Sequence, residues 1–195
     1  MVSKNNNIFL DNDKLNIVVA FTNKNKYISY NNELPWKMKL RGDNNFINLL
    51  IRLETNCVLI MGRKTFESIP KYKNLLLYVI TSKKFDNNNV KCFKKFNDAI
   101  LHAKSQNLVI IIFGGSEIYK EAINYEYKIF CTIVNEDNLL GDNKFPEINV
   151  SLINISEEVN NFLLKNNIKE TWKLDNINNI FEENEIKYSF YYGYS

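Results

Sequence analysis

The sequence predicts an α/β protein whose sheet is mostly parallel and includes an antiparallel strand late in the chain. Short runs that are almost entirely apolar, such as residues 15–21 and 57–61, are typical of strands buried on both faces. Segments with helical spacing lie between such runs, and residues 43–53 show this spacing most clearly. The segment 186–194 alternates aromatic and polar residues, which favours a less buried antiparallel strand.

The same alternation continues through the rest of the chain. Further strands are expected at 75–80, 90–92, 108–113 and 128–134, and further helices at 63–69, 97–103 and 118–123. The polar segment 22–32 predicts a loop, while residues 156–166 suggest an inserted helix. Because no repeat or linker interrupts the pattern, we expect a single domain at 14–195 after a poorly ordered tail at 1–13.

Composition argues against several classes of protein. The 195 residues are 45% hydrophobic, which is enough for one buried core, and the net charge of +3 does not favour a nucleic-acid partner. No apolar run approaches the roughly 20 residues that cross a bilayer, and the polar beginning of the sequence lacks the core of a signal peptide. Three widely spaced cysteines suggest reduced thiols, and a lone histidine cannot form a metal site. We therefore expect a cytoplasmic protein with no membrane, nucleic-acid or metal partner.

Two strand–glycine–helix junctions could hold phosphate groups. Gly62 follows the strand at 57–61, and the Gly-Gly-Ser segment at 114–116 follows the strand at 108–113. Glycine allows a ligand to approach the backbone closely, and the start of a helix offers free N–H groups. Each glycine could equally be an ordinary turn residue, but two such cradles at the carboxyl ends of parallel strands suit a dinucleotide.

A rigid loop is predicted between the first strand and the first helix. It contains Leu34, Pro35 and Trp36, and a Pro-Trp pair at such a junction suggests a loop that closes over a ligand.

These segments, in this order, resemble the dihydrofolate reductase family. The matching segments are 17–20 (Ile-Val-Val-Ala), 34–36 (Leu-Pro-Trp), 61–70 (Met-Gly-Arg-Lys-Thr-Phe-Glu-Ser-Ile-Pro), 113–119 (Phe-Gly-Gly-Ser-Glu-Ile-Tyr), Thr132, 141–147 (Gly-Asp-Asn-Lys-Phe-Pro-Glu) and 186–190 (Ile-Lys-Tyr-Ser-Phe). The resemblance covers about residues 15–192 and identifies the chain as a divergent member. It implies a dihydrofolate reductase-like fold with an eight-stranded, mostly parallel sheet flanked by helices. It also implies hydride transfer from NADPH to 7,8-dihydrofolate, which yields tetrahydrofolate for one-carbon metabolism.

The resemblance further implies which residues form the site. Asp43, Trp36 and Leu34 would be catalytic. The pterin would contact Val19, Ala20, Asp43, Phe46, Ile69, Phe113 and Thr132. NADPH would be bound by Ala20, Ile28, Gly62, Arg63, Lys64, Thr65, Thr81, Ser82, Lys83, Gly114, Gly115, Ser116, Glu117, Ile118 and Tyr119. In the family a cis peptide joins the two glycines of the second junction.

The chain departs from the family at the acid that serves the pterin. The usual acid position is Gly42 here, and Asp43 stands one residue closer to Phe46. Neighbouring helix positions differ by about 100° around the axis, so Asp43 still lies on the side of Phe46 and Leu50. An alternative is that Asp43 only caps the helix. Asn44 is polar where the family has an aromatic residue.

A second departure concerns the glutamate tail of the substrate. Leu76 stands where the family has an arginine that clamps the tail, and Lys71 or Lys73 would be weaker substitutes. Two alternatives therefore remain: an NADPH reductase of the same fold acting on another pterin or heterocycle, and a catalytically weakened nucleotide- or folate-binding protein. We expect a monomer, or one piece of a longer protein fused to thymidylate synthase.

Overall fold

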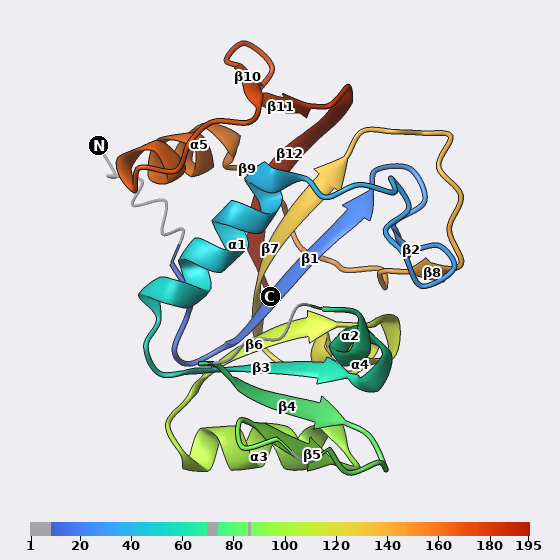
Figure 1. The fold of residues 1–195 in the computed structure, drawn as a ribbon, viewed down its shortest axis with the longest axis vertical. Coiled ribbons are helices and arrows are strands. Elements are labelled where there is room, and N and C mark those ends of the chain that lie inside the picture. The colour runs from blue at the N-terminus through green and yellow to red at the C-terminus, as the bar shows by residue number, and fades with distance from the viewer. Residues whose placement is uncertain (1–8, 70–73, 86) are drawn as a thin grey trace.

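One large sheet organises the protein (Figure 1). The computed structural model describes residues 9–69, 74–85 and 87–195. Within these residues the main sheet has ten strands in the order β10-β11-β12-β7-β1-β6-β3-β4-β5, with β9 paired to β12. Five neighbouring pairs, from β7–β1 to β4–β5, are parallel, and all pairs that involve β9, β10, β11 or β12 are antiparallel.

The elements have the following bounds. The strands are β1 (Leu15–Thr22), β2 (Tyr27–Ser29), β3 (Cys57–Gly62), β4 (Leu76–Ile80), β5 (Val90–Phe93), β6 (Val109–Gly114), β7 (Tyr127–Val134), β8 (Asn143–Lys144), β9 (Ile153–Asn154), β10 (Lys173–Asp175), β11 (Ile180–Glu183) and β12 (Ile186–Tyr194). The helices are α1 (Arg41–Leu53), α2 (Arg63–Ser68), α3 (Phe96–Ser105), α4 (Ser116–Ala122) and α5 (Ser156–Lys165). The predicted strands and helices are thus confirmed with shifts of one or two residues at their ends.

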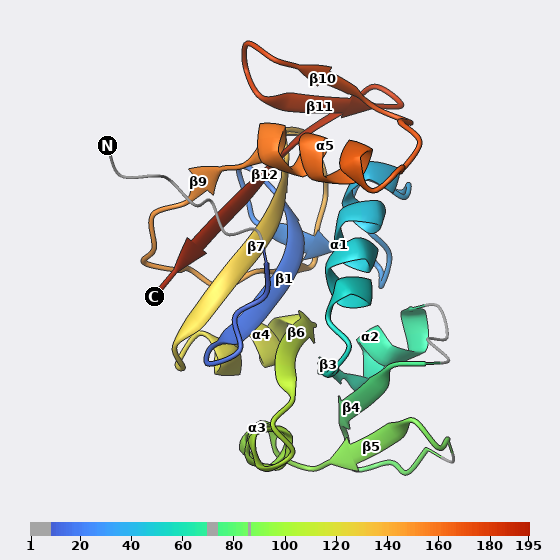
Figure 2. The same cartoon turned by 90° about the vertical axis from the view of Figure 1, so that its left-hand side faces the viewer.

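Helices cover both faces of the sheet. Successive side chains of the central strand β1 point to opposite faces, so they pack against different helices. Ile17 and Val19 in β1 face a buried cluster that includes residues of α3 and α4. Val18, between them, points to the opposite face and packs in a cluster with Ile51 of α1. Figure 2 shows α1 and α5 on this second side of the sheet. A strand buried on both faces accounts for the near-continuous apolar run of β1.

The late part of the chain differs most from expectation. The implied sheet of eight strands is extended by the hairpin β10–β11, which continues the sheet beyond β12. Strand β12 was expected to be less buried, and this expectation is wrong: Tyr188, Phe190 and Tyr192 are all at most 5% exposed. They are buried because they pack with Val159 and Leu163 of α5, the helix expected as an insertion.

Two smaller expectations also need correction. The predicted loop at 22–32 contains β2, which pairs with β8 in a separate two-stranded sheet. Of the predicted tail, residues 1–8 lie outside the described residues, but Asp11 is held to β1. Its backbone N–H donates to Asn16 Oδ1, and its carbonyl accepts from Asn16 Nδ2, each at 2.7 Å. Within the described ranges, no helix has the length and apolar character needed to cross a membrane.

The topology places a crevice at the carboxyl ends of the central strands. Strand β1 lies between β6 and β7, although the chain passes from β6 through α4 directly to β7. Connections therefore leave the sheet in opposite directions at β1, and such switch points open a crevice where ligands bind.

Candidate active site

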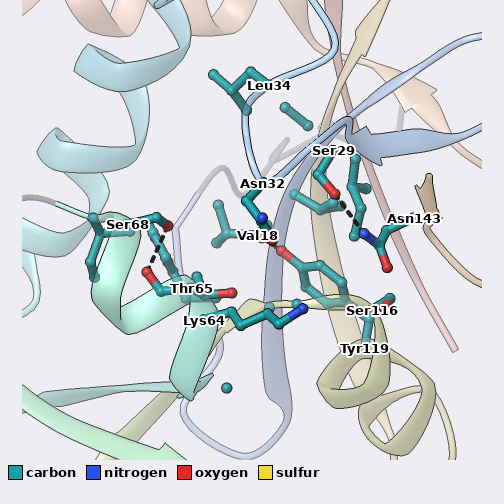
Figure 3. A pocket seen from close by; sticks show the side chains of 18 of the residues that line it. Val18, Ser29, Asn32, Leu34, Lys64, Thr65, Ser68, Ser116, Tyr119 and Asn143 are labelled. Atoms are coloured by element: carbon teal, nitrogen blue, oxygen red, sulfur yellow. Dashed lines mark hydrogen bonds between the residues drawn. The ribbon is translucent and has the colours of Figure 1, made fainter. Parts of the chain in front are cut away.

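A cavity of about 1200 Å³ occupies this crevice. Its walls come from β1, the loop before α1, the first half of α1, α2, and the junction between β6 and α4. Figure 3 shows side chains from the loop, including Leu34, and from the helices α2 and α4 around the same space. Both predicted glycine junctions and the predicted Pro-Trp loop therefore face a single cavity.

Asp43 lies in the cavity wall, in the first turn of α1. Its Oδ1 accepts a hydrogen bond of 2.6 Å from the Thr132 hydroxyl on β7. The residue in the cap position of α1 is Leu40, and no side chain from that position caps the helix. The alternative in which Asp43 is the helix cap is therefore wrong, because its carboxylate points across to β7.

The surroundings of Asp43 favour its protonated form. Burial raises the pKa of Asp43 from 3.8 to about 6, the hydrogen bond from Thr132 opposes this rise, and the charge of Glu183 adds to it. A carboxyl group with a pKa of about 6 holds a proton in part of the molecules near neutral pH, as a general acid must.

Gly42, four residues before Phe46, has little room for a side chain. A Cβ on Gly42 would lie only 2.4 Å from the Tyr188 hydroxyl oxygen and 3.5 Å from atoms of Phe181 and Trp172. A side chain at position 42 would therefore require Tyr188 of β12 to move, and Phe181 of β11 and Trp172 also pack against this position. Asp43, the next residue, is the one that reaches Thr132.

Trp36 presents a polar atom that lacks a partner among the described residues. The residue is 4% exposed, lines the cavity, and its indole Nε1 is buried without a hydrogen-bond acceptor. A buried N–H without an acceptor costs about 1–3 kcal/mol, so this group favours a bound water or ligand atom in the cavity. Leu34, two residues earlier, is 40% exposed and stands on the loop at the rim.

The two glycine junctions lie against each other. A Cβ on Gly62 would stand 3.8 Å from the backbone N of Gly115 and 3.9 Å from the backbone O of Gly114. Gly114 has a φ of +99° and is joined to Gly115 by a cis peptide. Bare backbone from two strand ends thus forms one continuous surface that a long ligand can approach.

Polar side chains surround this backbone surface. Lys64 and Thr65 of α2 and Ser116 of α4 line the cavity, and in Figure 3 the Lys64 side chain extends toward the α4 side. Arg63 donates to both carboxylate oxygens of Glu67, at 3.0 and 2.7 Å. The site therefore offers a flexible cation and two hydroxyls beside glycine backbone, a set that suits phosphate oxygens.

Tyr119 connects this region to the central strand. Its hydroxyl donates to the backbone oxygen of Val18 at 2.8 Å, and its ring packs against Gly114. Burial raises the pKa of Tyr119, and the charge of Asp43 raises it further, so the phenol stays protonated and keeps this hydrogen bond.

The loop that carries Leu34 and Trp36 is tied to the segment around β8. Asp142 accepts from the backbone N–H of Asn31 at 2.8 Å and from the Ser29 hydroxyl at 3.1 Å. Asn143 Nδ2 donates to the same hydroxyl at 2.9 Å (Figure 3). The bonds from Asn31 and Ser29 lower the pKa of the exposed Asp142 carboxyl, the bond from Asn31 contributing most. These hydrogen bonds hold the start of the loop, at residues 29–31, against β8 and the residue before it.

Most of the residues named from the sequence line the cavity. They are Val19, Ala20, Ile28, Leu34, Trp36, Asp43, Gly62, Arg63, Lys64, Thr65, Ile69, Phe113, Gly114, Gly115, Ser116, Glu117, Ile118 and Tyr119. Five others lie off the lining: Phe46, Thr81, Ser82, Lys83 and Thr132. Phe46 is 2% exposed because it packs edge-on against Phe130 and Phe190, and Thr132 stands behind Asp43. Lys71 and Lys73 lie outside the described residues.

Sequence reasoning missed other members of the site. Asn32, Lys37 and Asn143 line the cavity, and Glu183 lies behind Asp43. Asn32 and Lys37 lie in the loop around the matching segment 34–36, and Asn143 lies in β8 within the matching segment 141–147, so only their place beside these motifs could have marked them. Glu183 is separated from Gly42, which it contacts, by 141 residues.

Replacing Thr132 with valine is expected to raise the pKa of Asp43 by about one unit, because a hydrogen bond to a charged group is worth about 1.5–3 kcal/mol. NMR titration of protein labelled at the aspartate carboxyl carbons measures this pKa directly. The exposed Thr55, two residues beyond the end of α1, supplies the matched control Thr55→Val. A Thr132→Val protein whose Asp43 titrates at or below the wild-type pH would contradict the role given to this hydroxyl.

Comparisons with known proteins agree with this geometry. The sequence model of the family described as dihydrofolate reductase matches residues 14–181. The chain is 36% identical over 138 residues to dihydrofolate reductase type 1 of Escherichia coli, covering 69% of this chain and 83% of that protein. It is 33% identical over 135 residues to a dihydrofolate reductase of Buchnera aphidicola, covering 67% and 78%. A bifunctional dihydrofolate reductase-thymidylate synthase of Paramecium tetraurelia is 26% identical over 181 residues, covering 92% and 34%. The chain belongs to the dihydrofolate reductase family.

Proposed function

We propose that this protein reduces 7,8-dihydrofolate to tetrahydrofolate and takes the hydride from NADPH. The observation that carries this proposal is that Asp43, held from behind by Thr132, lines the same cavity as the two glycine junctions. One end of the cavity then offers a proton, and the other offers a surface for phosphates. Membership of the dihydrofolate reductase family supports the proposal.

The glycine junctions fit a dinucleotide. Gly62, Gly114 and Gly115 leave a bare backbone cradle, and Lys64, Thr65 and Ser116 would hold phosphate oxygens around it. The nicotinamide of a bound NADPH supplies the hydride. The buried Tyr119 hydroxyl fixes the floor of this region to β1, so the cradle is formed before a ligand arrives.

Asp43 is proposed to serve the pterin. A carboxylate in this position can accept hydrogen bonds from the amino-pyrimidine edge of the pterin. Its protonated form can deliver a proton, directly or through water, to the ring nitrogen that is protonated during the reduction. Thr132 holds the carboxylate in one orientation. The indole N–H of Trp36 is available to a water or ligand oxygen at the same end of the cavity.

Leu34 is proposed to shield the reacting atoms. It stands at the cavity rim on the loop tied down by Asp142, and an apolar side chain there would exclude water from the hydride transfer. We further propose that the protein acts in the cytoplasm as a monomer, or as one part of a longer fused protein. The bifunctional Paramecium relative supports the second arrangement.

A second candidate function is the reduction of a dihydropterin without a glutamate tail. It is favoured by Leu76, an aliphatic residue at the position where the resemblance places the tail-binding arginine. The ratio of kcat/KM for dihydrofolate to kcat/KM for a tail-free dihydropterin distinguishes the two candidate functions. A ratio above one supports dihydrofolate as the substrate, and a ratio at or below one supports the second candidate.

Steady-state oxidation of NADPH in the presence of dihydrofolate tests the proposed function. We expect turnover that depends on both compounds, with kcat in the range of about 1–1000 per second that is typical of enzymes. NADPH binding, followed by its fluorescence, provides the control for a folded cofactor site. Binding of NADPH without turnover would overturn the proposal and leave a nucleotide-binding protein.

A further inference from the structure

Glu183 is a second carboxylate close to the cavity, and it does not line the cavity. It lies at the end of β11 and is 2% exposed. Three groups from different parts of the chain donate to it. They are the Thr171 hydroxyl to Oε1 at 2.9 Å, the Tyr188 hydroxyl to Oε2 at 3.2 Å, and the backbone N–H of Gly42 to Oε2 at 3.2 Å. A buried charge without such partners would be strongly destabilising, so these donors account for its presence.

The contact with Gly42 joins Glu183 to the start of α1. The first N–H groups of a helix have no partner within the helix, and Leu40 in the cap position has no side-chain acceptor to offer. Glu183 supplies the missing acceptor from a strand far along the chain. A carboxylate at this end of a helix is also favoured by the helix dipole. The first turn of α1 is thus anchored to the hairpin β11–β12.

The next residue after Gly42 is Asp43, so the anchor and the proposed acid share one helical turn. The titratable groups that face Asp43 are Glu183 from β11, Tyr188 from β12 and Tyr119 from α4. Burial and the two carboxylates keep Tyr188 protonated, so Glu183 is the one group among them that adds a negative charge. Its charge disfavours the ionised form of Asp43.

We propose that Glu183 is a positioning residue, which fixes the orientation of Asp43 through the first turn of α1 and places a second carboxylate behind it. This inference deepens the proposed dihydrofolate reduction and rests on it for its catalytic meaning. A purely structural Glu183 would stabilise the fold and leave the titration of Asp43 unchanged. The two roles therefore differ in a quantity that can be measured without turnover.

The test compares Glu183→Gln with Glu182→Gln. Glutamine keeps the shape and an acceptor oxygen but removes the charge. Glu182 is the adjacent residue of β11, is exposed, and points to the opposite face of the strand, so its replacement removes the same charge without touching the anchor. NMR titration of the Asp43 carboxyl carbon, assigned with Asp43→Asn, is the readout.

We expect the Asp43 midpoint to fall by about 0.5–1 pH unit in Glu183→Gln, the effect of removing one nearby like charge, and to stay at the wild-type value in Glu182→Gln. The pH at which kcat declines should fall by the same amount. An Asp43 midpoint in Glu183→Gln equal to that in Glu182→Gln would overturn the proposal.

A second variant keeps the proposal testable where Glu183→Gln does not fold. Thr171→Val removes one donor from Glu183 and keeps its charge. The less compensated carboxylate should raise the Asp43 midpoint by about a few tenths of a unit, the opposite sign to Glu183→Gln. A midpoint that is unchanged or lower would count against the proposal. Since the titration needs no substrate, an inactive wild type with the expected midpoints would overturn the proposed function alone.

Discussion

Replacing Asp43 with asparagine is expected to lower the turnover of dihydrofolate at neutral pH by about a hundredfold to ten-thousandfold, the usual contribution of a positioned general acid. Asparagine keeps the size of the side chain and removes the proton that Asp43 would supply. The remaining rate should rise as the pH falls, because solvent can then protonate the pterin in place of the carboxyl group. NADPH oxidation measured across the pH range gives both results.

Two controls separate this effect from damage to the site. NADPH should bind Asp43→Asn as it binds the wild type, because the glycine junctions are unchanged. Asp98→Asn, in the first turn of α3 on the other side of the sheet, should retain full turnover. Turnover by Asp43→Asn within tenfold of the wild-type value at neutral pH would show that Asp43 is not the general acid.

The same substitution should stabilise the fold. The folded protein holds the proton of Asp43 up to about pH 6, whereas an unfolded chain releases it near 3.8. The stability that the protonated carboxyl contributes below pH 3.8 is therefore lost as the pH rises through about 6. The Asp43 side chain is partly accessible to solvent, which reduces the effect, so Asp43→Asn should gain roughly 2 kcal/mol at neutral pH relative to the wild type. Urea unfolding at two pH values measures this gain.

Replacing Gly114 with alanine is expected to destabilise the protein by about 3 kcal/mol and to weaken NADPH binding. Its φ of +99° strains any residue with a side chain, and the added Cβ would lie 2.9 Å from atoms of the Tyr119 ring and hydroxyl. Backbone strain costs about 1–3 kcal/mol, and overpacking costs a similar amount. Displacing Tyr119 would also break its hydrogen bond to Val18. For a protein of this size the melting temperature should fall by roughly 10 °C.

Gly115→Ala supplies the matched control. The φ of Gly115 is −75°, and the nearest atom to an added Cβ is the Thr65 hydroxyl oxygen at 3.4 Å. The same change one residue later should therefore cost less than about 1 kcal/mol of stability. Equal destabilisation by the two variants would show that the positive φ and the Tyr119 contact do not distinguish Gly114.

Much of the fold was predictable because the signals that specify it are local. The strand at 15–21 is apolar throughout, since helices cover both faces of β1, and the helix at 43–53 repeats its apolar residues on one face. The glycine junctions were predictable for a similar reason, because a strand, a glycine and a helix start are consecutive in the sequence. Both junctions then meet at one cavity because parallel strands end at the same edge.

The remaining features depend on contacts between distant segments. The aromatic pattern of β12 indicated a half-exposed strand, and nothing near it reveals that α5 packs on its outer face. The position of the acid was ambiguous for the same reason. Whether residue 42 can carry a side chain is decided by Tyr188, so the sequence around α1 could not show why glycine stands there.

The anchoring of α1 by Glu183 has a consequence for synthesis on the ribosome. The polypeptide emerges from its amino end, so α1 is complete long before β11, and the hydrogen bond between them spans 141 residues. Strand β1 likewise can pair in the sheet only after its neighbours β6 and β7 have been synthesised. A nascent chain that ends before residue 183 therefore has the proposed acid on a helix whose first turn is not yet fixed. Catalytic competence should therefore appear abruptly once β11 and β12 have emerged, rather than grow with chain length.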